Sequence, residues 1–260
     1  LDRSIKLLDN VKDELACIII EPLLGGGGCI PANINYLKGL EEFCKRNDIL
    51  FILDEIVTGF RLNFGSVSSL YHLDPDMITL GKIVGGGLPI GVVCGKKEIM
   101  KVANPVENRN KEQLCYIGGG TFSSNPLTMT AGYATLDYIN KNRQMLYNKI
   151  NKLGDAARNG LRKIFSDYGL KTRVTGIGSL FLTHFLSDEV NDITNANDVA
   201  LSDIETLTKY HFSLMAKYGI FFLPHKMGAI SIVHDVKDIQ SLINATQKII
   251  ESDILMKIKN

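Results

Sequence analysis

Two ionisable residues, Asp54 and Lys82, each follow a short apolar run and could act together on a carbonyl or an amine. Asp54 follows Ile49–Leu53 in the segment LDEIVTGFR, and Lys82 follows Asp76–Leu80 in TLGKIVGGG. The sequence neighbours of Lys82 carry no charge. A lysine shielded from water loses part of the stabilisation of its charge, and its amine can then attack a carbonyl to form a Schiff base. The structural alternatives are a strand-end carboxylate and a lysine whose amine stays in water.

Strand and helix patterns alternate along the part of the chain that contains both residues. Short apolar runs predict four strands, at 16–20, 49–53, 76–80 and 90–94. Helical spacing of apolar residues predicts helices at 33–47 and 96–102. This alternation is typical of a mainly parallel sheet covered by helices. Ligands of such sheets bind outside the carboxyl ends of the strands, where Asp54 and Lys82 lie.

A long helical pattern follows, from Pro126 to about Phe165, and we expect a break in it near Gly154. Pro126 suits the first turn of a helix. The character of the sequence changes beyond this helix. We therefore predict two domains, residues 1–150 and residues 151–260, with the boundary inside the long helical region at 145–160.

The last part of the chain has the pattern of a smaller α+β domain. Strands are predicted at 173–174, 180–185, 220–223 and 229–233. Helices are predicted at 202–218 and 235–250. Ser202 and Glu205 have the spacing of a capping box at the start of the first of these helices.

Ten of the 24 glycines fall in three clusters, at 25–28, 85–87 and 118–120. None of the clusters matches GxxxxGK[ST] or a convincing GxGxxG, so the P-loop and NAD interpretations are weak. The third cluster precedes Thr121 and would place amides and a hydroxyl near a helix start, which suits an anion. We interpret the triple glycine after Lys82 as allowing the backbone to approach a ligand closely. A flexible loop is the alternative for each cluster.

The bulk composition argues against several classes of protein. The net charge is +1, from 29 basic and 28 acidic residues, which gives no reason to expect a nucleic-acid or anionic-membrane partner. No apolar run approaches the ~20 residues of a membrane-spanning helix, and no signal peptide is visible at the start. Five scattered cysteines argue against a zinc site and a disulfide scaffold. We expect a reducing, cytoplasmic compartment.

Four segments resemble a known family. EPLLGGGGCIPA, ILFILDEIVTGFR, PDMITLGKIVGGGLPIG and GGGTFSSNPLTMTAG occur in this order and are similar to the class III pyridoxal-phosphate (PLP) aminotransferases, in the branch of glutamate-1-semialdehyde 2,1-aminomutase. The resemblance covers about Cys17 to Leu136 and is looser in the tail. It implies the fold type I of PLP enzymes, which combines a large α/β domain with a small α+β C-terminal domain. It also implies PLP as cofactor, a small amino substrate, and a homodimer with the active site at its interface.

The resemblance implies a role for each of five residues. Asp54 would pair with the pyridinium nitrogen of the cofactor and keep it protonated, which makes the ring an electron sink. Ile56 would pack against the ring face. Lys82 would hold the cofactor as a Schiff base and, once released, would move a proton between substrate and cofactor carbons. Thr121 would donate to the cofactor phosphate, in this family across a dimer interface, and Glu21 is a further cofactor-binding candidate.

Two departures from the family pattern keep alternatives open. We find no Ser-Gly-x-Glu-Ala phosphate loop and no ring-stacking aromatic upstream of Ile18, and the segment Leu223–His234 is shorter than in the aminomutases. We therefore expect the back part of a longer enzyme. The leading hypothesis is an aminomutase that converts glutamate-1-semialdehyde to 5-aminolevulinate. The alternatives are an intermolecular class III aminotransferase and a fragment that is inactive as it stands.

Overall fold

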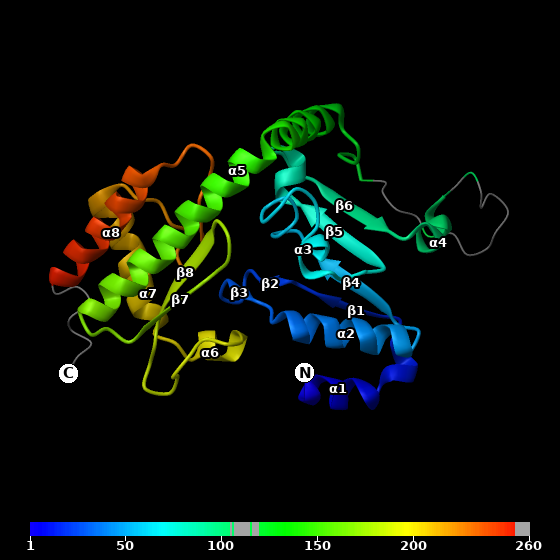
Figure 1. Cartoon of the computed structure of the whole chain (residues 1–260), viewed down its shortest axis with the longest axis horizontal. Helices are drawn as coiled ribbons and strands as arrows, with labels where there is room; N and C mark the ends of the chain where they lie inside the picture. The colour runs from blue at the N-terminus through cyan, green and yellow to red at the C-terminus, as the bar shows by residue number, and fades with distance from the viewer. Residues whose placement is uncertain (105, 107–114, 116–119, 253–260) are drawn as a thin grey trace. The chain divides into compact units, whose positions relative to one another are not determined.

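The chain forms two compact units. A computed structural model describes residues 1–104, 106, 115 and 120–252 (Figure 1). The first unit comprises Leu1–Pro22 and Ala32–Arg143, and the second comprises Leu23–Pro31 and Gln144–Asn260. The long helix α5 (Pro126–Asp167) contributes residues to both units.

A four-stranded sheet forms the framework of the first unit. Its strands lie in the order β1 (Cys17–Ile20), β4 (Leu50–Asp54), β5 (Met77–Gly81) and β6 (Gly91–Gly95). The first three strands are parallel and β6 is antiparallel, so the prediction of a mainly parallel sheet is confirmed (Figure 1). The short connection from β5 to β6 permits only the antiparallel direction, because a parallel neighbour requires a crossover of about a dozen residues or more.

Helix α2 (Ile34–Arg46) packs on this sheet through one apolar face. The side chain of Asn33 accepts a hydrogen bond from the N–H of Asn35 at 2.8 Å and caps the start of the helix. The buried residues of α2 and β4 form one hydrophobic cluster, which includes Leu37, Leu40, Phe43, Cys44, Phe51 and Leu53. Each large side chain buried there contributes about 1.5–3 kcal/mol to the free energy of unfolding. The helix predicted at 33–47 is confirmed.

Shorter helices complete the first unit. They are α1 (Asp2–Asp9), η1 (Lys12–Glu14), α3 (Ser68–Tyr71), η2 (Lys82–Gly85), α4 (Lys97–Met100) and η3 (Lys101–Ala103). The helix predicted at 96–102 is thus a turn of α-helix followed by a 3₁₀ turn.

Helix α5 is continuous through Gly154, so the expected break there is wrong. The side chain of Asn125 accepts a hydrogen bond from the N–H of Thr128 at 2.9 Å, and Pro126 occupies the first helical position. A Cβ atom at Gly154 would lie 1.9 Å from the carbonyl oxygen of Gly178. Glycine therefore allows a neighbouring loop to touch the helix backbone, and packing outweighs its low helix propensity.

The second unit is a small sheet covered by helices. The antiparallel strands β7 (Thr172–Thr175), β8 (Leu180–Phe185) and β9 (Gly228–Ala229) form the sheet. The helices that accompany it are α6 (Ala196–Ala200), α7 (Ile204–Tyr218), α8 (Val236–Glu251) and the second part of α5. A hairpin of β2 (Leu23–Leu24) and β3 (Ile30–Pro31) also belongs to this unit.

The core of the second unit is built around aromatic side chains. Phe165 of α5 contacts Phe185 of β8 and Tyr210 of α7 edge to face, with ring centroids 5.4 and 5.7 Å apart. The hydroxyl of Tyr210 lies 2.7 Å from Oγ1 of Thr246 on α8. The buried phenol therefore has a hydrogen-bond partner, as a polar group in a core requires.

Two expected strands and one expected helix cap differ from the structure. Residues 220–223 form no strand, because Phe221 and Leu223 point to solvent instead of a sheet neighbour, and the strand expected at 229–233 shrinks to β9. The capping box at Ser202 is also wrong. The cap of α7 is Asp203, whose side chain accepts from the N–H of Thr206 at 2.9 Å.

Capping boxes occur instead at the starts of α6 and α8. They pair Asn195 with Asp198 and Asp235 with Asp238. Aspartate replaces the usual glutamate or glutamine at the third helical position, so a search for the common pattern does not find them.

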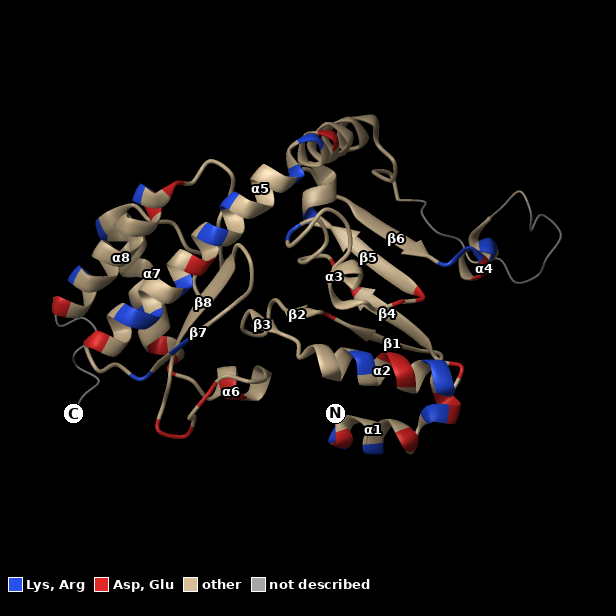
Figure 2. Cartoon of the chain, in the orientation of Figure 1, with Lys and Arg blue, Asp and Glu red and all other residues tan. Residues whose placement is uncertain are grey.

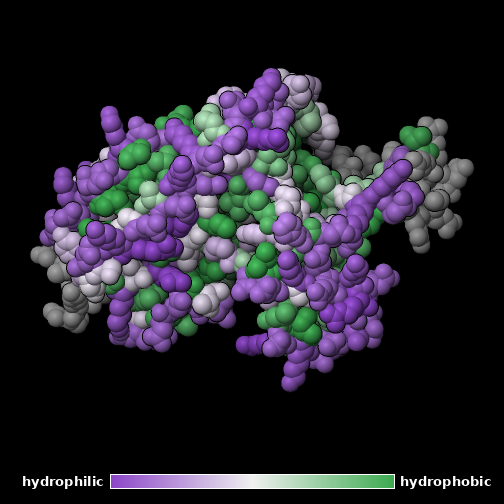
Figure 3. All heavy atoms as spheres, viewed as in Figure 1, coloured by the Kyte–Doolittle hydropathy of each residue, from purple (hydrophilic) through white to green (hydrophobic). Residues whose placement is uncertain are grey.

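Charged residues of both signs are interspersed along the helix surfaces, for example on α2 and α5 (Figure 2). On the face seen in Figure 3, hydrophilic residues surround smaller hydrophobic areas. Within the described ranges, none of the helices is both long and apolar enough to cross a bilayer.

The contact at Gly154 predicts an unusual response to a Gly→Ala substitution. Gly154→Ala should lower the free energy of unfolding by about 1–3 kcal/mol or more, because the new methyl group overlaps a backbone carbonyl. Urea unfolding followed by circular dichroism measures the change.

Gly39→Ala in α2 is the matched control. The three atoms nearest to its Cβ would all belong to the side chain of Leu1, which can move, so the substitution should be neutral or slightly stabilising. Equal effects of the two substitutions would contradict the close contact at Gly154.

Candidate functional site

Parallel pairing brings three of the sequence-predicted residues to one edge of the first unit's sheet. Ile20 of β1 lies opposite Leu53 of β4, and Asp54 lies opposite Thr79 of β5. Glu21 directly follows β1, and Lys82 directly follows β5. Because the carboxyl ends of parallel strands meet at the same edge, Glu21, Asp54 and Lys82 share the position at which α/β sheets bind ligands.

The carboxylate of Asp54 is oriented by a backbone N–H two residues further along the chain. Its Oδ1 accepts a hydrogen bond from the N–H of Ile56 at 3.1 Å. The side chain of Asp54 is half-buried. A carboxylate fixed in this way at a strand end can present its other oxygen to a cationic N–H group.

Ile56 lies beside the backbone that leads into Lys82. Its Cγ2 lies 3.3 Å from the position of a Cβ at Gly81, the residue before the lysine. About a third of the Ile56 surface remains exposed, 37%. An apolar surface thus lies next to Lys82 and is open to a ligand.

Lys82 adopts a backbone conformation that favours glycine. Its φ is 51°, in the left-handed region, and its side chain is exposed. Such a conformation costs an ordinary residue of order 1–3 kcal/mol, and residues that adopt it cluster at functional sites. The cost is hard to explain by packing, because glycine would occupy the position without strain.

The triple glycine after Lys82 brings the backbone close to a helix. A Cβ at Gly86, whose φ is 61°, would lie 2.4 Å from the carbonyl oxygen of Ala131 in α5. A Cβ at Gly132 would lie 2.3 Å from the carbonyl oxygen of Val84. The close approach at Gly86 is therefore to a helix, and it anchors the Lys82 loop on the start of α5. The expected approach to a ligand stays a prediction.

Glu55, which directly follows Asp54, is a buried carboxylate whose structural role the sequence did not predict. It is fully buried, and its Oε2 accepts from the N–H of Val67 at 2.8 Å and from the Thr58 hydroxyl at 3.3 Å. Its Oε1 accepts from the hydroxyl of Ser66. The N–H of Glu55 donates to the carbonyl of Thr79 at 2.9 Å and continues the β4–β5 ladder beyond Asp54.

The contacts of Glu55 connect the end of β4 to Thr58 and to the segment Ser66–Val67. Burial raises the pKa of this carboxyl, and the hydrogen bonds from Ser66, Val67 and Thr58 partly oppose that rise. The sequence offers one signal for this role, which is that the acidic residue Glu55 lies next to Asp54 and between the apolar residues Leu53 and Ile56. Its hydroxyl partner Ser66 lies 11 residues away, and no local pattern predicts that pairing.

Thr121 lies in an exposed turn just before α5. Among the described residues, no hydrogen bond connects Thr121 to Asp54 or Lys82. The first two glycines of the cluster before it, Gly118 and Gly119, lie outside the described residues. Its role at a phosphate therefore stays a prediction. The same holds for Glu21, whose side chain is half-buried at the end of β1.

The edge of the sheet fits a planar, nitrogen-containing cofactor such as PLP. The hydroxyl of Thr79 is buried without a hydrogen-bond partner in the described structure, and Thr79 is the register partner of Asp54. A buried hydroxyl without a partner costs about 1–3 kcal/mol, so a polar ligand beside Asp54 would stabilise it. The carboxylate, the amine and the apolar surface would supply further contacts for such a ring.

Comparisons with known proteins agree with this arrangement. The family model for class III aminotransferases matches residues 2–233. Glutamate-1-semialdehyde 2,1-aminomutase from Methanosphaera stadtmanae is 37% identical over 244 residues, which are 93% of this chain and 54% of that protein. The chain thus spans about half the length of such relatives.

Solved structures show the same fold. An omega-transaminase from Sphaerobacter thermophilus superposes with a TM-score of 0.85 at 29% identity, over 98% of this chain and 55% of that one. A transaminase with PLP bound superposes with a TM-score of 0.81 at 26% identity, over 99% and 56% of the two chains. The chain therefore has the PLP fold type I architecture that the resemblance implied.

The buried Glu55 predicts a specific dependence of stability on pH. Its pKa is raised in the folded state, so the folded chain binds more protons than the unfolded chain between the ordinary glutamate pKa of about 4.3 and the raised value. The free energy of unfolding should therefore fall as the pH rises through this window. Glu55→Gln should remove this part of the fall, which has a slope of at most about 1.4 kcal/mol per pH unit.

Urea unfolding of both proteins at a series of pH values measures the difference. Subtracting the two curves cancels the contributions of all other groups. A difference that does not change with pH would contradict the burial of an ionisable group at this position. Glu55→Ala also removes the oxygens that accept hydrogen bonds from Val67 and Ser66. It should lower the free energy of unfolding by about 1–3 kcal/mol more than Glu55→Gln does.

Proposed function

The chain belongs to the class III aminotransferase family, and on this premise we propose that it carries the lysine part of a PLP site for amino-group transfer. The observation that supports this proposal best is the meeting of Asp54 and Lys82 at one sheet edge, with Lys82 in a strained left-handed conformation. Glycine would occupy this position without strain, so we infer that the lysine side chain itself has a role there.

Each residue at the edge has a role that follows from its chemistry. PLP, when bound, supplies an aldehyde and a ring that withdraws electrons. The Asp54 carboxylate, fixed by the Ile56 N–H, would keep a proton on the ring nitrogen. Ile56 would cover one ring face and exclude water from it. The Lys82 amine would hold the cofactor. When free, it would take a proton from the substrate carbon and return it to a carbon of the cofactor.

We further propose that a second copy of the chain completes the site. In this proposal Thr121 donates its hydroxyl to the phosphate of the cofactor held by the partner, and Glu21 lies near the cofactor. The exposure of the Thr121 turn supports a role in contacts outside its own unit. The division of the chain into two compact units after Arg143 supports a boundary close to the proposed one, between a cofactor domain at 1–150 and a small domain at 151–260, although Leu23–Pro31 belongs to the second unit.

The substrate we propose is glutamate-1-semialdehyde, which an aminomutase converts to 5-aminolevulinate. The support is the 37% identity to a protein with that name. An intermolecular aminotransferase is the second candidate, supported by the 29% identity to an omega-transaminase. Incubation with PLP and glutamate-1-semialdehyde separates them. Formation of 5-aminolevulinate without an added amino donor would support the mutase, and turnover only with a donor and a keto acid would support the transferase.

Covalent trapping tests the role of Lys82. The full chain incubated with PLP and reduced with borohydride should carry the cofactor on the peptide that contains Lys82, as found by mass spectrometry. Lys82→Ala should abolish the label, and Lys45→Ala, at an exposed lysine of α2, should leave it unchanged. A label of equal strength in Lys82→Ala would overturn the proposed site.

Asp54→Asn tests the electrostatic role of the carboxylate. The substitution keeps the size of the side chain and removes the charge that would hold a proton on the ring nitrogen. Turnover should fall by about 10²–10⁴-fold, the usual scale for loss of an acid–base group, while trapping at Lys82 persists. Unchanged turnover would show that the ring nitrogen needs no partner from Asp54.

A further inference from the structure

A separate cavity in the second unit is lined by basic residues. Its volume is about 440 Å³, and it lies beside the last turns of α5, the strand β7 and the segment after β8. The lining residues are Arg162, Ser166, Leu170, Lys171, Thr172, Arg173, Val174, Leu186, Val190 and Asn191. Three of these carry a positive charge and none is acidic.

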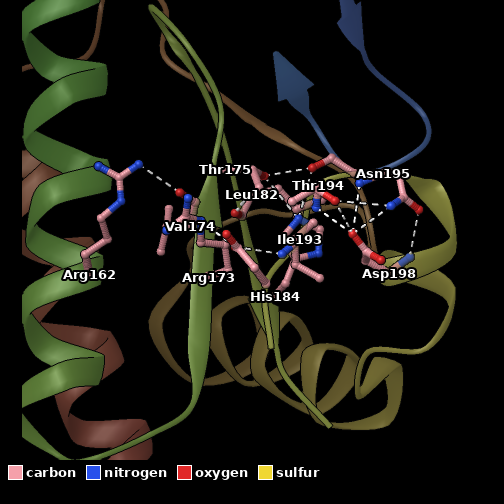
Figure 4. A network of polar contacts seen from close by, with 12 residues as sticks. Arg162, Arg173, Val174, Thr175, Leu182, His184, Ile193, Thr194, Asn195 and Asp198 are labelled. Carbon is pink, nitrogen blue, oxygen red and sulfur yellow. Dashed lines mark hydrogen bonds and ion pairs between the residues drawn. The ribbon is translucent and has the colours of Figure 1, made fainter. Parts of the chain in front are cut away.

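Arg162 is fixed at the wall of the cavity. Its Nη2 donates to the carbonyl of Val174 at 2.8 Å, and its Nη1 donates to Oδ1 of Asn159 at 3.1 Å. Figure 4 shows the side chain reaching from α5 towards β7. A guanidinium has five N–H groups, and these two contacts leave it with donors for a ligand.

Like charges surround Arg162. Burial lowers the pKa of its guanidinium, repulsion from Arg158 and Arg173 lowers it further, and Asp155 partly opposes these effects. Arg158 is itself buried and donates to the carbonyls of Gly178 and Leu180, both at 2.7 Å. The positive charge that accumulates here would be stabilised by a negative group in the cavity.

The acidic partners of the other two cations lie outside the lining. Nζ of Lys171 is 3.0 Å from Asp188, and Nε of Arg173 is 3.1 Å from Asp192. All four side chains are about half exposed or more, so these ion pairs are worth less than about 1 kcal/mol. A ligand with two or more negative charges can therefore exchange with them at little cost.

The structural alternative is that Arg162 only covers an edge. β7 is an edge strand, and Arg162 covers the Val174 carbonyl that faces away from β8. One arginine would be enough for that purpose. It does not explain why Lys171 and Arg173 line the same cavity without an acidic lining residue.

We propose that this cavity binds a small polyanion with phosphate or carboxylate groups, held by Arg162, Arg173 and Lys171. A volume of about 440 Å³ is within the range of about 300–1,000 Å³ for small-molecule sites. The bidentate geometry of the two guanidinium groups suits either kind of oxyanion. The proposed ligand is independent of the PLP site, which lies in the first unit.

Titration calorimetry of the full chain with inorganic phosphate and with citrate, at constant ionic strength, tests the proposal. We expect saturable binding of at least one of the two, and weakening of about tenfold or more in Arg162→Gln and in Arg173→Gln, since a charge-assisted hydrogen bond is worth about 1.5–3 kcal/mol. Binding of phosphate alone assigns a phosphorylated ligand, and binding of citrate alone assigns a polycarboxylate.

Arg143→Gln is the matched control, because Arg143 is an arginine of the same helix that does not line the cavity. It should bind as the wild type does. If Arg162→Gln fails to fold by circular dichroism, Arg173→Gln and Lys171→Gln decide the question. The absence of saturable binding to both anions, or equal binding by the wild type and the cavity variants, would overturn the proposal.

Discussion

The parallel pairing of β4 with β5 is the constraint on which the candidate site depends. It sets Asp54 opposite Thr79 and continues through the hydrogen bond from the Glu55 N–H to the Thr79 carbonyl. A slip of one residue would turn Asp54 to the other face of the sheet. The buried carboxylate of Glu55 holds the same strand end in place, because its oxygens accept hydrogen bonds from Ser66 and Val67. The position of Asp54 is thus fixed from two sides.

Close backbone contacts fix the lysine as firmly. Gly86 and Gly132 bring the loop after Lys82 against the first turns of α5, at distances that a side chain would not allow. The loop can then support a left-handed Lys82 whose conformation would otherwise relax. The strain at the lysine and the glycine contacts behind it are two parts of one arrangement. Both serve a residue whose side chain itself is exposed.

The sequence predicted those features that depend on local patterns. The strands of the parallel sheet, helix α2 and the placement of Asp54 and Lys82 follow from apolar periodicity and from residues at strand ends. The misplaced helix caps are local, but the other misses involve partners that are distant in the sequence. Gly154 suggested a helix break, but its effect depends on Gly178, and the apolar run at 220–223 lacked a neighbouring strand. Glu55 depends on Ser66 in the same way, so only the folded chain reveals its role.

The loop after Glu21 shows how polar contacts assign a segment to a unit. The carbonyl of Gly28 accepts from the Thr175 hydroxyl at 2.7 Å and from Nε2 of His184 at 3.0 Å, so Nε2 must carry the proton. Burial lowers the pKa of His184 and so favours the neutral imidazole, which has one N–H donor. A Cβ at Gly28 would lie 2.6 Å from the side chain of Val199, so this glycine is required by packing. Gly28 of the first glycine cluster is therefore required by packing in the second unit. The motif that contains it, EPLLGGGGCIPA, is also one of the four segments that indicated the family.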